Sequence, residues 1–317
     1  MATFTMRPYR SHAQDADAVM AFLTEISLHP AYVSEYQIGD FVWRAYKAPE
    51  STSTDEIALC HDSQGRVAAI GWFDPPRECE MTIHPALHGT AAQAEMIVQI
   101  SSWAEERYAG QTESQDKPLR LTVNADDVAA QRVLSEHGYH YSGEILYASN
   151  FRTLEGPLAA PALPGGYEIV AMTDDADLVD RVEVHRDVWA PSKFTLEGYQ
   201  RLRRAPVYRQ DLDLAVRAPD GRYASYLIAW WDPAAKSGLL EPVGARAEYR
   251  RLGLTRALIQ EALIRLRNLG ATRCYVNSEA NEVPSNALYR SAGFQRIVDL
   301  QWWTKQEQSQ PKTSPKP

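Results

Sequence analysis

An arginine-rich segment with one glycine stands directly before a predicted helix in the C-terminal half of the chain. Residues 250–256 read RRLGLTR, between an apolar strand and a helical pattern over 253–269. The first amides of a helix have no partners inside it, and the helix dipole places partial positive charge there. Glycine lets the backbone approach a ligand closely. The pattern Arg250-x-x-Gly253-x-Thr255 therefore predicts an anion site, suited to phosphate.

An ordinary helix start with solvated arginines is the alternative for this segment, and the loop alone does not decide. Neither G-x-x-x-x-G-K-[ST] nor G-x-G-x-x-G, the usual phosphate-binding motifs, occurs in the chain. No H-E-x-x-H or Cys/His cluster indicates a metal, so we expect none. No G-x-S-x-G indicates a serine hydrolase.

The residues that follow the helix narrow the interpretation. A predicted strand over 273–278 leads to Asn281 and then to the run Asn286-Ala287-Leu288-Tyr289-x-x-x-Gly293-Phe294. Together with the arginine loop, this order resembles the GNAT superfamily of acyl-CoA-dependent N-acyltransferases. The resemblance is strong over 221–303 and only topological over 167–219. The family loop is usually Q/R-x-x-G-x-G/A, so Thr255 departs from it at the last position.

The resemblance implies acetyl-CoA as cosubstrate and a place for each of its parts. The pyrophosphate would lie on the loop and the helix start. The pantetheine arm would pair with a splayed strand, as an added strand pairs with a sheet edge. Asn281 and Asn286 would bind the pantetheine or line its entry. The other implied cofactor-binding residues are Val243, Gly244, Ala245, Arg250, Arg251, Leu252, Gly253, Leu254, Thr255 and Arg256.

Two residues are candidates for proton transfer. Tyr289 matches the family tyrosine that protonates the departing thiolate, and a phenol with a pKa near 10 suits that role. The alternative is an aromatic residue packed beside Phe294. Glu241 is the candidate base, placed by strand alternation on the face of Leu239 and Val243. Many family members carry their glutamate at the position of Leu239, so a structural or substrate-binding role for Glu241 stays open.

The acceptor cannot be read from residue types, because acceptor pockets in this fold are built from variable loops. Several aromatic residues and an arginine cluster lie where the family places its acceptor-binding helices, but core packing and a solvated face explain them more simply. These aromatic residues are Trp189, Phe194, Tyr199 and Tyr208, and the arginine cluster is the segment 201–204. We interpret His185 as an ordinary helix residue.

The elements that must position these residues occur twice along the chain. The proline- and glycine-rich segment 154–166 is typical of a linker. The runs QGR and DGR, each followed by an apolar strand that ends in Asp-Pro, correspond on its two sides, and Gly138 corresponds to Gly293. We predict an α/β protein with two GNAT-like domains, each a twisted mixed β-sheet flanked by helices: 1–153 and 167–304. Residues 305–317 form a predicted disordered tail.

The N-terminal half lacks the chemistry of its counterpart. At the equivalent loop it reads Leu87-His88-Gly89-Thr90, without arginine, and Leu134 and Gln131 stand at the places of Tyr289 and Asn286. This half is predicted to be a degenerate copy of the fold. We therefore expect one acetyl-CoA per chain, bound by the C-terminal domain.

Composition limits the possible partners. The chain has 317 residues and a net charge of −8, which disfavours nucleic acid. It has no apolar run long enough to span a membrane, no signal-peptide pattern and three isolated cysteines, so we expect a cytoplasmic monomer or homodimer away from membranes. The predicted function is acetyl transfer from acetyl-CoA to a small-molecule primary amine by direct attack. The alternatives are a non-catalytic acyl-CoA-binding module, or the same fold acylating a protein amine or using another acyl-CoA.

Overall fold

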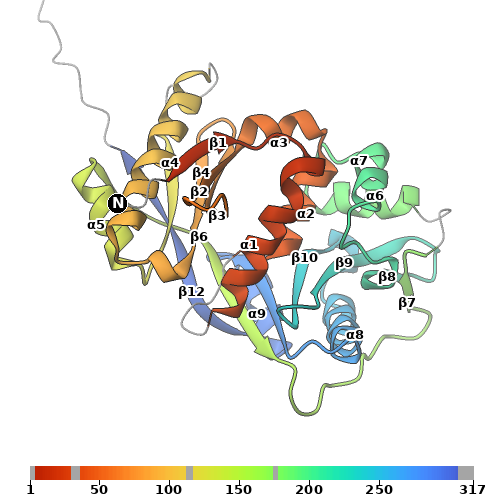
Figure 1. The fold of residues 1–317 in the computed structure, drawn as a ribbon. Coiled ribbons are helices and arrows are strands. Elements are labelled where there is room, and N and C mark those ends of the chain that lie inside the picture. Colours follow the sequence, from red (N-terminus) through yellow and green to blue (C-terminus); the bar gives the residue numbers. More distant parts are fainter. Residues whose placement is uncertain (1–3, 30–35, 112–116, 174–177, 306–317) are drawn as a thin grey trace, which may run out of the picture. The chain divides into compact units, whose positions relative to one another are not determined.

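The computed structural model describes residues 4–29, 36–111, 117–173 and 178–305 (Figure 1). The chain forms two compact units that do not coincide with its two halves. Unit 1 contains Met1–Tyr9, Glu56–Leu146 and Asp299–Pro317, and unit 2 contains Arg10–Asp55 and Tyr147–Val298. Each half of the chain therefore contributes segments to both units. The division into sequence domains 1–153 and 167–304 stays a prediction about the repeat.

Unit 1 is a mixed sheet in the order β1-β2-β3-β4-β5-β12. Only the pair β4/β5 is parallel among these neighbours. Helix α4 packs Met96, Ile100 and Trp103 into the core of this unit. The elements are β1 (Thr5–Pro8), β2 (Ile57–His61), β3 (Val67–Asp74), β4 (Glu78–Ile83), α4 (Ala91–Ala109), β5 (Arg120–Asn124), α5 (Val128–Glu136) and the end of β12 (Gln295–Lys305).

Unit 2 repeats this pattern in the order β6-β11-β10-β9-β8-β7, with β10/β11 as its parallel pair. Its helices are α1 (Asp17–Leu28), α2 (Ile38–Lys47), α3 (Glu50–Glu56, whose last residue belongs to unit 1), α6 (Leu178–Val188), α7 (Leu196–Leu202), α8 (Leu254–Asn268) and α9 (Val283–Ser291). Its strands are the end of β6 (Tyr139–Thr153), β7 (Glu168–Ala171), β8 (Asp213–Arg217), β9 (Tyr223–Asp232), β10 (Ser237–Ala245) and β11 (Arg273–Glu279).

The last strand of each half of the chain pairs with a strand from the other half. Residues 147–153 of β6 pair antiparallel with β11, and residues 300–304 of β12 pair antiparallel with β5. Both strands therefore cover a sheet edge that would otherwise present unpaired backbone groups. The repeat predicts the order of elements within each half, but its periodicity contains no signal for this exchange.

Helix α2 packs in unit 2, although it lies near the N-terminus. A Cβ atom built at Gly39 would lie 2.3 Å from Cγ of Trp230 in β9, which leaves no room for any other side chain. Trp230 itself is 1% exposed. The missing side chain allows the helix to rest directly on the indole ring and fixes α2 against the sheet.

Most element predictions for the C-terminal half are confirmed. Helix α8 spans Leu254–Asn268 and β11 spans Arg273–Glu279, close to the predicted 253–269 and 273–278. The linker 154–166 contains no helix or strand. Lys305 is the last residue of β12, and the rest of the predicted disordered tail lies outside the described residues. Within the ranges described, no helix is long and apolar enough to cross a bilayer.

Candidate active site

The site forms where two parallel strands of unit 2 separate. Strands β10 and β11 are in register only from Ser237 to Leu239, opposite Arg273 to Tyr275. Beyond Leu239, β10 continues to Ala245 paired with β9 alone. Among the described strands, the backbone of residues 240–245 therefore has a ladder partner on one side only. This is the splayed strand that the sequence places around Val243.

A bulge in β10 determines which way Glu241 faces. Leu240 is opposite Ala229 and Val243 is opposite Leu227, so Glu241 and Pro242 share the place of one residue. As a result Val243 packs on the α8 side with Leu240. The expectation that Glu241 shares a face with Val243 is wrong, because the extra residue breaks the strand's alternation.

Glu241 is a carboxyl group with an unusual proton affinity. Burial raises its pKa to about 7, while the charges of Lys47 and Arg44 on α2 act in the opposite direction. Its backbone carbonyl accepts a hydrogen bond of 2.6 Å from Nε1 of Trp230. A buried carboxylate with a pKa near neutrality can accept a proton at physiological pH.

Tyr289 lies within the electrostatic reach of Glu241. Burial raises the pKa of its phenol, and the negative charge of Glu241 raises it further. The side chain is 6% exposed, and its ring meets Phe294 edge-on with centroids 6.1 Å apart. Among the described residues its hydroxyl has no hydrogen-bond partner. The ring thus packs in the core, as the alternative interpretation held, while burial and the charge of Glu241 keep its phenol protonated.

The arginine loop ends in an uncapped helix start. Arg251 and Gly253 both adopt left-handed backbone conformations, with φ of 69° and 78°. No side chain of the described residues caps the N-terminus of α8. Nε of Arg250 donates to the carbonyl of Ala245 at 3.3 Å, which joins the loop to the end of β10. Backbone amides in such a turn point outward together and suit an anion.

The hydroxyl group of Thr255 has a structural role, which explains why this residue departs from the family pattern. The Ser225 hydroxyl donates its only hydrogen to the carbonyl of Gly244 at 2.8 Å. The contact of 2.9 Å between Ser225 Oγ and Thr255 Oγ1 must therefore have Thr255 as donor. Through Ser225, the first turn of α8 is bonded to the splayed strand. Because the Thr255 hydroxyl is bonded to Ser225, it does not cap the start of α8.

The two candidate asparagines differ in their surroundings. The amide oxygen of Asn286 accepts from Ser278, and its nitrogen donates to the carbonyls of Glu279, Ala280 and Glu282. It therefore shapes the turn between β11 and α9. Asn281 is exposed in this turn.

A buried polar cluster adjoins the bulge. The hydroxyl of Tyr226 lies 2.7 Å from both Nδ1 of His185 and Nε1 of Trp189. Burial, and then the charges of Arg181 and Lys47, lower the pKa of His185 to about 3, so this ring is neutral. His185 is thus a buried residue of α6 whose ring takes part in this polar cluster.

Arg181, next to this cluster, is part of a buried ion pair. Arg181 is fully buried, donates to Asp213 at 2.8 Å and stacks 4.1 Å from the ring centroid of Tyr226. Asp213 also accepts from the hydroxyls of Tyr199 and Tyr208. Packing thus accounts for these two tyrosines, as predicted. The cluster itself was missed, because its residues lie far apart in the sequence.

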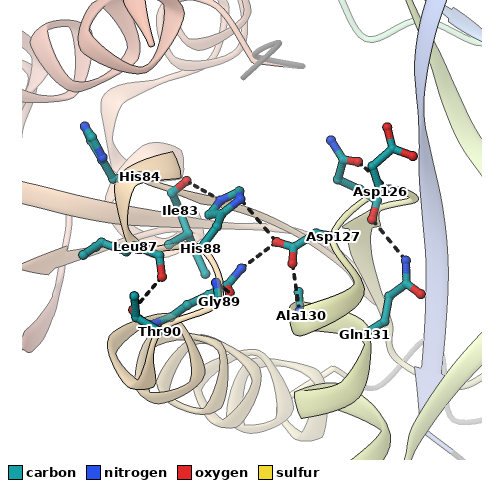
Figure 2. A network of polar contacts seen from close by, with 12 residues as sticks. Ile83, His84, Leu87, His88, Gly89, Thr90, Asp126, Asp127, Ala130 and Gln131 are labelled. Carbon is teal, nitrogen blue, oxygen red and sulfur yellow. Dashed lines mark hydrogen bonds and ion pairs between the residues drawn. The ribbon is translucent and has the colours of Figure 1, made fainter. Parts of the chain in front are cut away.

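The equivalent helix start in unit 1 is closed by its own side chains. Thr90 accepts from the amide of Gln93, and the Gln93 side chain accepts from the amide of Gly89 at 2.7 Å. Figure 2 shows the carboxylate of Asp127 beside His88 and Gly89, where Nε2 of Gln93 also reaches it at 2.5 Å. Internal caps and a negative charge thus take the place that an anion occupies at an open helix start.

Comparisons with known proteins identify similar sequences and similar folds. Residues 182–294 match the acetyltransferase (GNAT) family. The chain is 25% identical over 239 residues to mycothiol acetyltransferase of Saccharomonospora viridis. The aligned region covers 70% of this chain and 72% of that protein.

Two solved structures share the fold. A GCN5-related N-acetyltransferase from Sphaerobacter thermophilus has a TM-score of 0.64 and 18% identity and covers 95% of both chains. A tandem GNAT protein from the clavulanic acid biosynthesis pathway has a TM-score of 0.63 and 18% identity, over 95% of this chain and 98% of that one. Residues 182–294 thus match the acetyltransferase (GNAT) family, and the chain as a whole shares the fold of a tandem GNAT protein.

The raised pKa of Glu241 predicts a pH-dependent cost to stability. The unfolded carboxyl titrates near 4.5 and the folded one near 7. The folded state therefore binds this proton more tightly, and the stabilisation that this provides is lost as the pH rises through about 7. We expect the free energy of unfolding of Glu241→Gln, relative to that of wild type, to be larger at pH 8 than at pH 5, as measured by urea unfolding. Glu183→Gln, an exposed position on α6, is the control. A gain that is the same at both pH values would contradict the prediction.

Proposed function

We propose that unit 2 transfers an acetyl group from acetyl-CoA to a primary amine, by direct attack at the place where β10 and β11 separate. The observation that carries this proposal is the position of Glu241. Its carboxyl group has a pKa near 7, acts electrostatically on the Tyr289 phenol, and belongs to the same strand that is bonded to an open helix start. A base, an acid and an anion site thus converge on one splayed strand.

The cosubstrate's phosphates would lie on the amides from Arg251 to Arg256 at the start of α8. The dipole of a helix of 15 residues and the side chains of Arg250 and Arg251 supply the positive charge. The pantetheine arm would extend along residues 243–245, where β10 has no second neighbour. Asn281 would line the entry, and Asn286 would hold the turn beside it.

The proton transfers follow from this arrangement. The thioester supplies the acetyl group, and the neutral amine forms the new C–N bond as the C–S bond breaks. Glu241 accepts the proton that the amine must lose. A backbone amide near Val243 donates a hydrogen bond to the oxygen that becomes negative during attack. Tyr289 donates its proton to the departing thiolate, which its raised pKa leaves available at neutral pH.

The first test asks whether unit 2 alone binds the cofactor. Gly253 and Gly89 have similar positive φ values, 78° and 74°, and a Cβ at either would meet nothing within 4 Å. We expect Gly253→Asp to weaken CoA binding by roughly tenfold or more, because it adds a negative charge at the anion site. Gly89→Asp should leave it unchanged. Calorimetric titration should give one CoA per wild-type chain. Two tight sites, or unchanged affinity in Gly253→Asp, would contradict the assignment.

The role of Tyr289 is tested by removing its hydroxyl alone. Tyr289→Phe keeps the ring that packs against Phe294, so folding should be preserved. We expect kcat to fall by roughly 10²-fold while the affinity for CoA changes little, because the acid acts only after attack. The measurement is steady-state thiol release together with calorimetry. Wild-type turnover with chemistry as the slow step would exclude Tyr289 as the acid.

The role of Glu241 is tested by the pH profile. In the wild type, kcat/KM should rise as the pH passes through about 7 and Glu241 loses its proton. Glu241→Gln should lower kcat by roughly 10²-fold and remove this ascending limb, leaving only the limb set by the acceptor amine. CoA affinity, measured in parallel, should stay the same. If the limb near 7 persists in the variant, another group is the base.

A further inference from the structure

Strand β6 carries two polar side chains that reach helix α9. Asn150 and Arg152 lie two positions apart on this strand, so they point to the same face of the sheet. Their register partners on β11 are Val276 and Cys274. Both residues belong to the N-terminal half of the sequence, but they lie in unit 2. The strand that ends the first half of the chain therefore adds side chains to the surroundings of α9.

Asn150 acts on the beginning of α9 through two other side chains. Its Nδ2 atom donates a hydrogen bond of 3.1 Å to the hydroxyl of Ser278. That hydroxyl donates its only hydrogen to Oδ1 of Asn286, at 2.8 Å. Asn286 is a residue of α9 and donates to carbonyls of the turn that precedes this helix. Because Asn150 is 3% exposed and also bonds to the backbone carbonyl of Ala148 at 2.9 Å, this series of bonds begins at a fixed point of the sheet.

Arg152 acts on the other end of the same helix. Nη1 of its guanidinium donates to the backbone carbonyl of Ala292, the residue that follows α9. A Cβ atom at Gly293 would lie 2.9 Å from this nitrogen, and Gly293 has a φ of 87°, which favours glycine. The glycine therefore lets the arginine approach the C-terminal end of α9, where a positive charge is also favourable for the helix dipole.

Tyr289 lies between these two attachments. It is three residues after Asn286 and three residues before Ala292. Its ring packs against Phe294, but its hydroxyl has no hydrogen-bond partner among the described residues. The position of the hydroxyl therefore depends on the position of the helix that carries it.

Unit 1 differs at the equivalent places. By the repeat that relates the two halves, Leu134 stands at the place of Tyr289, and Lys305 of β12 stands at the place of Asn150. The ammonium group of Lys305 bonds to Glu105 of α4 at 2.7 Å, and α4 is not the counterpart of α9. The tyrosine and the asparagine thus occur together in unit 2 and are both replaced in unit 1.

We propose that Asn150 and Arg152 are positioning residues for the reaction, because they hold α9 at both ends and thereby place the phenol of Tyr289 where the departing thiolate forms. The proposal rests on the proposed function, in which Tyr289 is the acid. Neither residue transfers a proton itself. A proton donor must lie within hydrogen-bond reach of the atom that it protonates, and a displacement of about 1 Å can lower a rate by roughly 10²-fold.

The first measurement asks whether the attachment holds α9 in solution. Arg152→Met keeps most of the side-chain length and removes its donors. We expect the amides of residues 288–292 to exchange their hydrogens roughly tenfold faster in this variant, because the last turn of α9 then opens more easily. Arg267→Met is the matched control, since Arg267 is an exposed residue of α8 that donates to the carbonyl of Gly156 at 3.0 Å. It should leave exchange in α9 unchanged. Unchanged exchange in Arg152→Met would overturn the proposal.

The second measurement asks whether the attachment acts through Tyr289. Thiol release from acetyl-CoA is followed with the most active member of a panel of primary amines. We expect Arg152→Met and Asn150→Leu each to lower kcat by roughly tenfold, while the affinity for CoA measured by calorimetry stays the same. In Tyr289→Phe, which has no proton to donate, the same substitutions should lower kcat no further. Arg152→Lys, which keeps a donor, should retain most of the turnover.

The outcomes separate this proposal from the proposed function. Thiol release with none of the amines, or wild-type turnover in Tyr289→Phe, refutes the proposed function and this proposal together. If Tyr289→Phe is slow but the β6 variants lower kcat equally with and without the tyrosine hydroxyl, or not at all, the acid stands and the role of β6 is wrong. Urea unfolding checks that each variant folds. If Arg152→Met does not fold, Asn150→Leu decides by the same two measurements.

Discussion

The separation of β10 from β11 after Leu239 is the constraint on which the site depends. Inside a sheet, a backbone without a second neighbour leaves donors and acceptors unpaired, which is costly unless a ligand or another group meets them. The bulge places Glu241 and Pro242 opposite a single residue of β9, and the link from Thr255 through Ser225 to Gly244 ties the start of α8 to the same strand. One irregular strand thereby sets the spacing between Glu241 and the helix start.

The two units show how a few side chains close or leave open a helix start at equivalent places. Both contain a glycine with positive φ directly before a long helix. In unit 1, Thr90 and Gln93 occupy the amides of this region and Asp127 adds negative charge. In unit 2, no described side chain caps the helix, and arginines adjoin it. A helix start that is satisfied internally has little to offer an anion.

The interleaving of the chain gives the N-terminal half a direct part in unit 2. Residues 10–55 pack there, so Lys47 and Arg44 act on a glutamate almost 200 positions further along the sequence. Strand β6 likewise pairs with β11, and strand β12 pairs with β5, so each pairs with a strand from the other half of the chain. The N-terminal half of the chain thus takes part in unit 2 by packing and by charge.

The sequence by itself predicted the order of elements, the repeat and the arginine loop, because each of these depends on local periodicity or short spacing, and the family resemblance named Glu241 as candidate base and Tyr289 as candidate acid. It did not determine the strand exchange, the approach of α2 to the site or the neutral state of His185. It also misplaced Glu241, since alternation along a strand holds only while the ladder is regular and the bulge becomes visible only against β9. Pairing between distant segments and the burial of individual charges are properties of the packed chain. Only the tertiary structure decides them, because the free energy of each depends on neighbours that the sequence does not bring together.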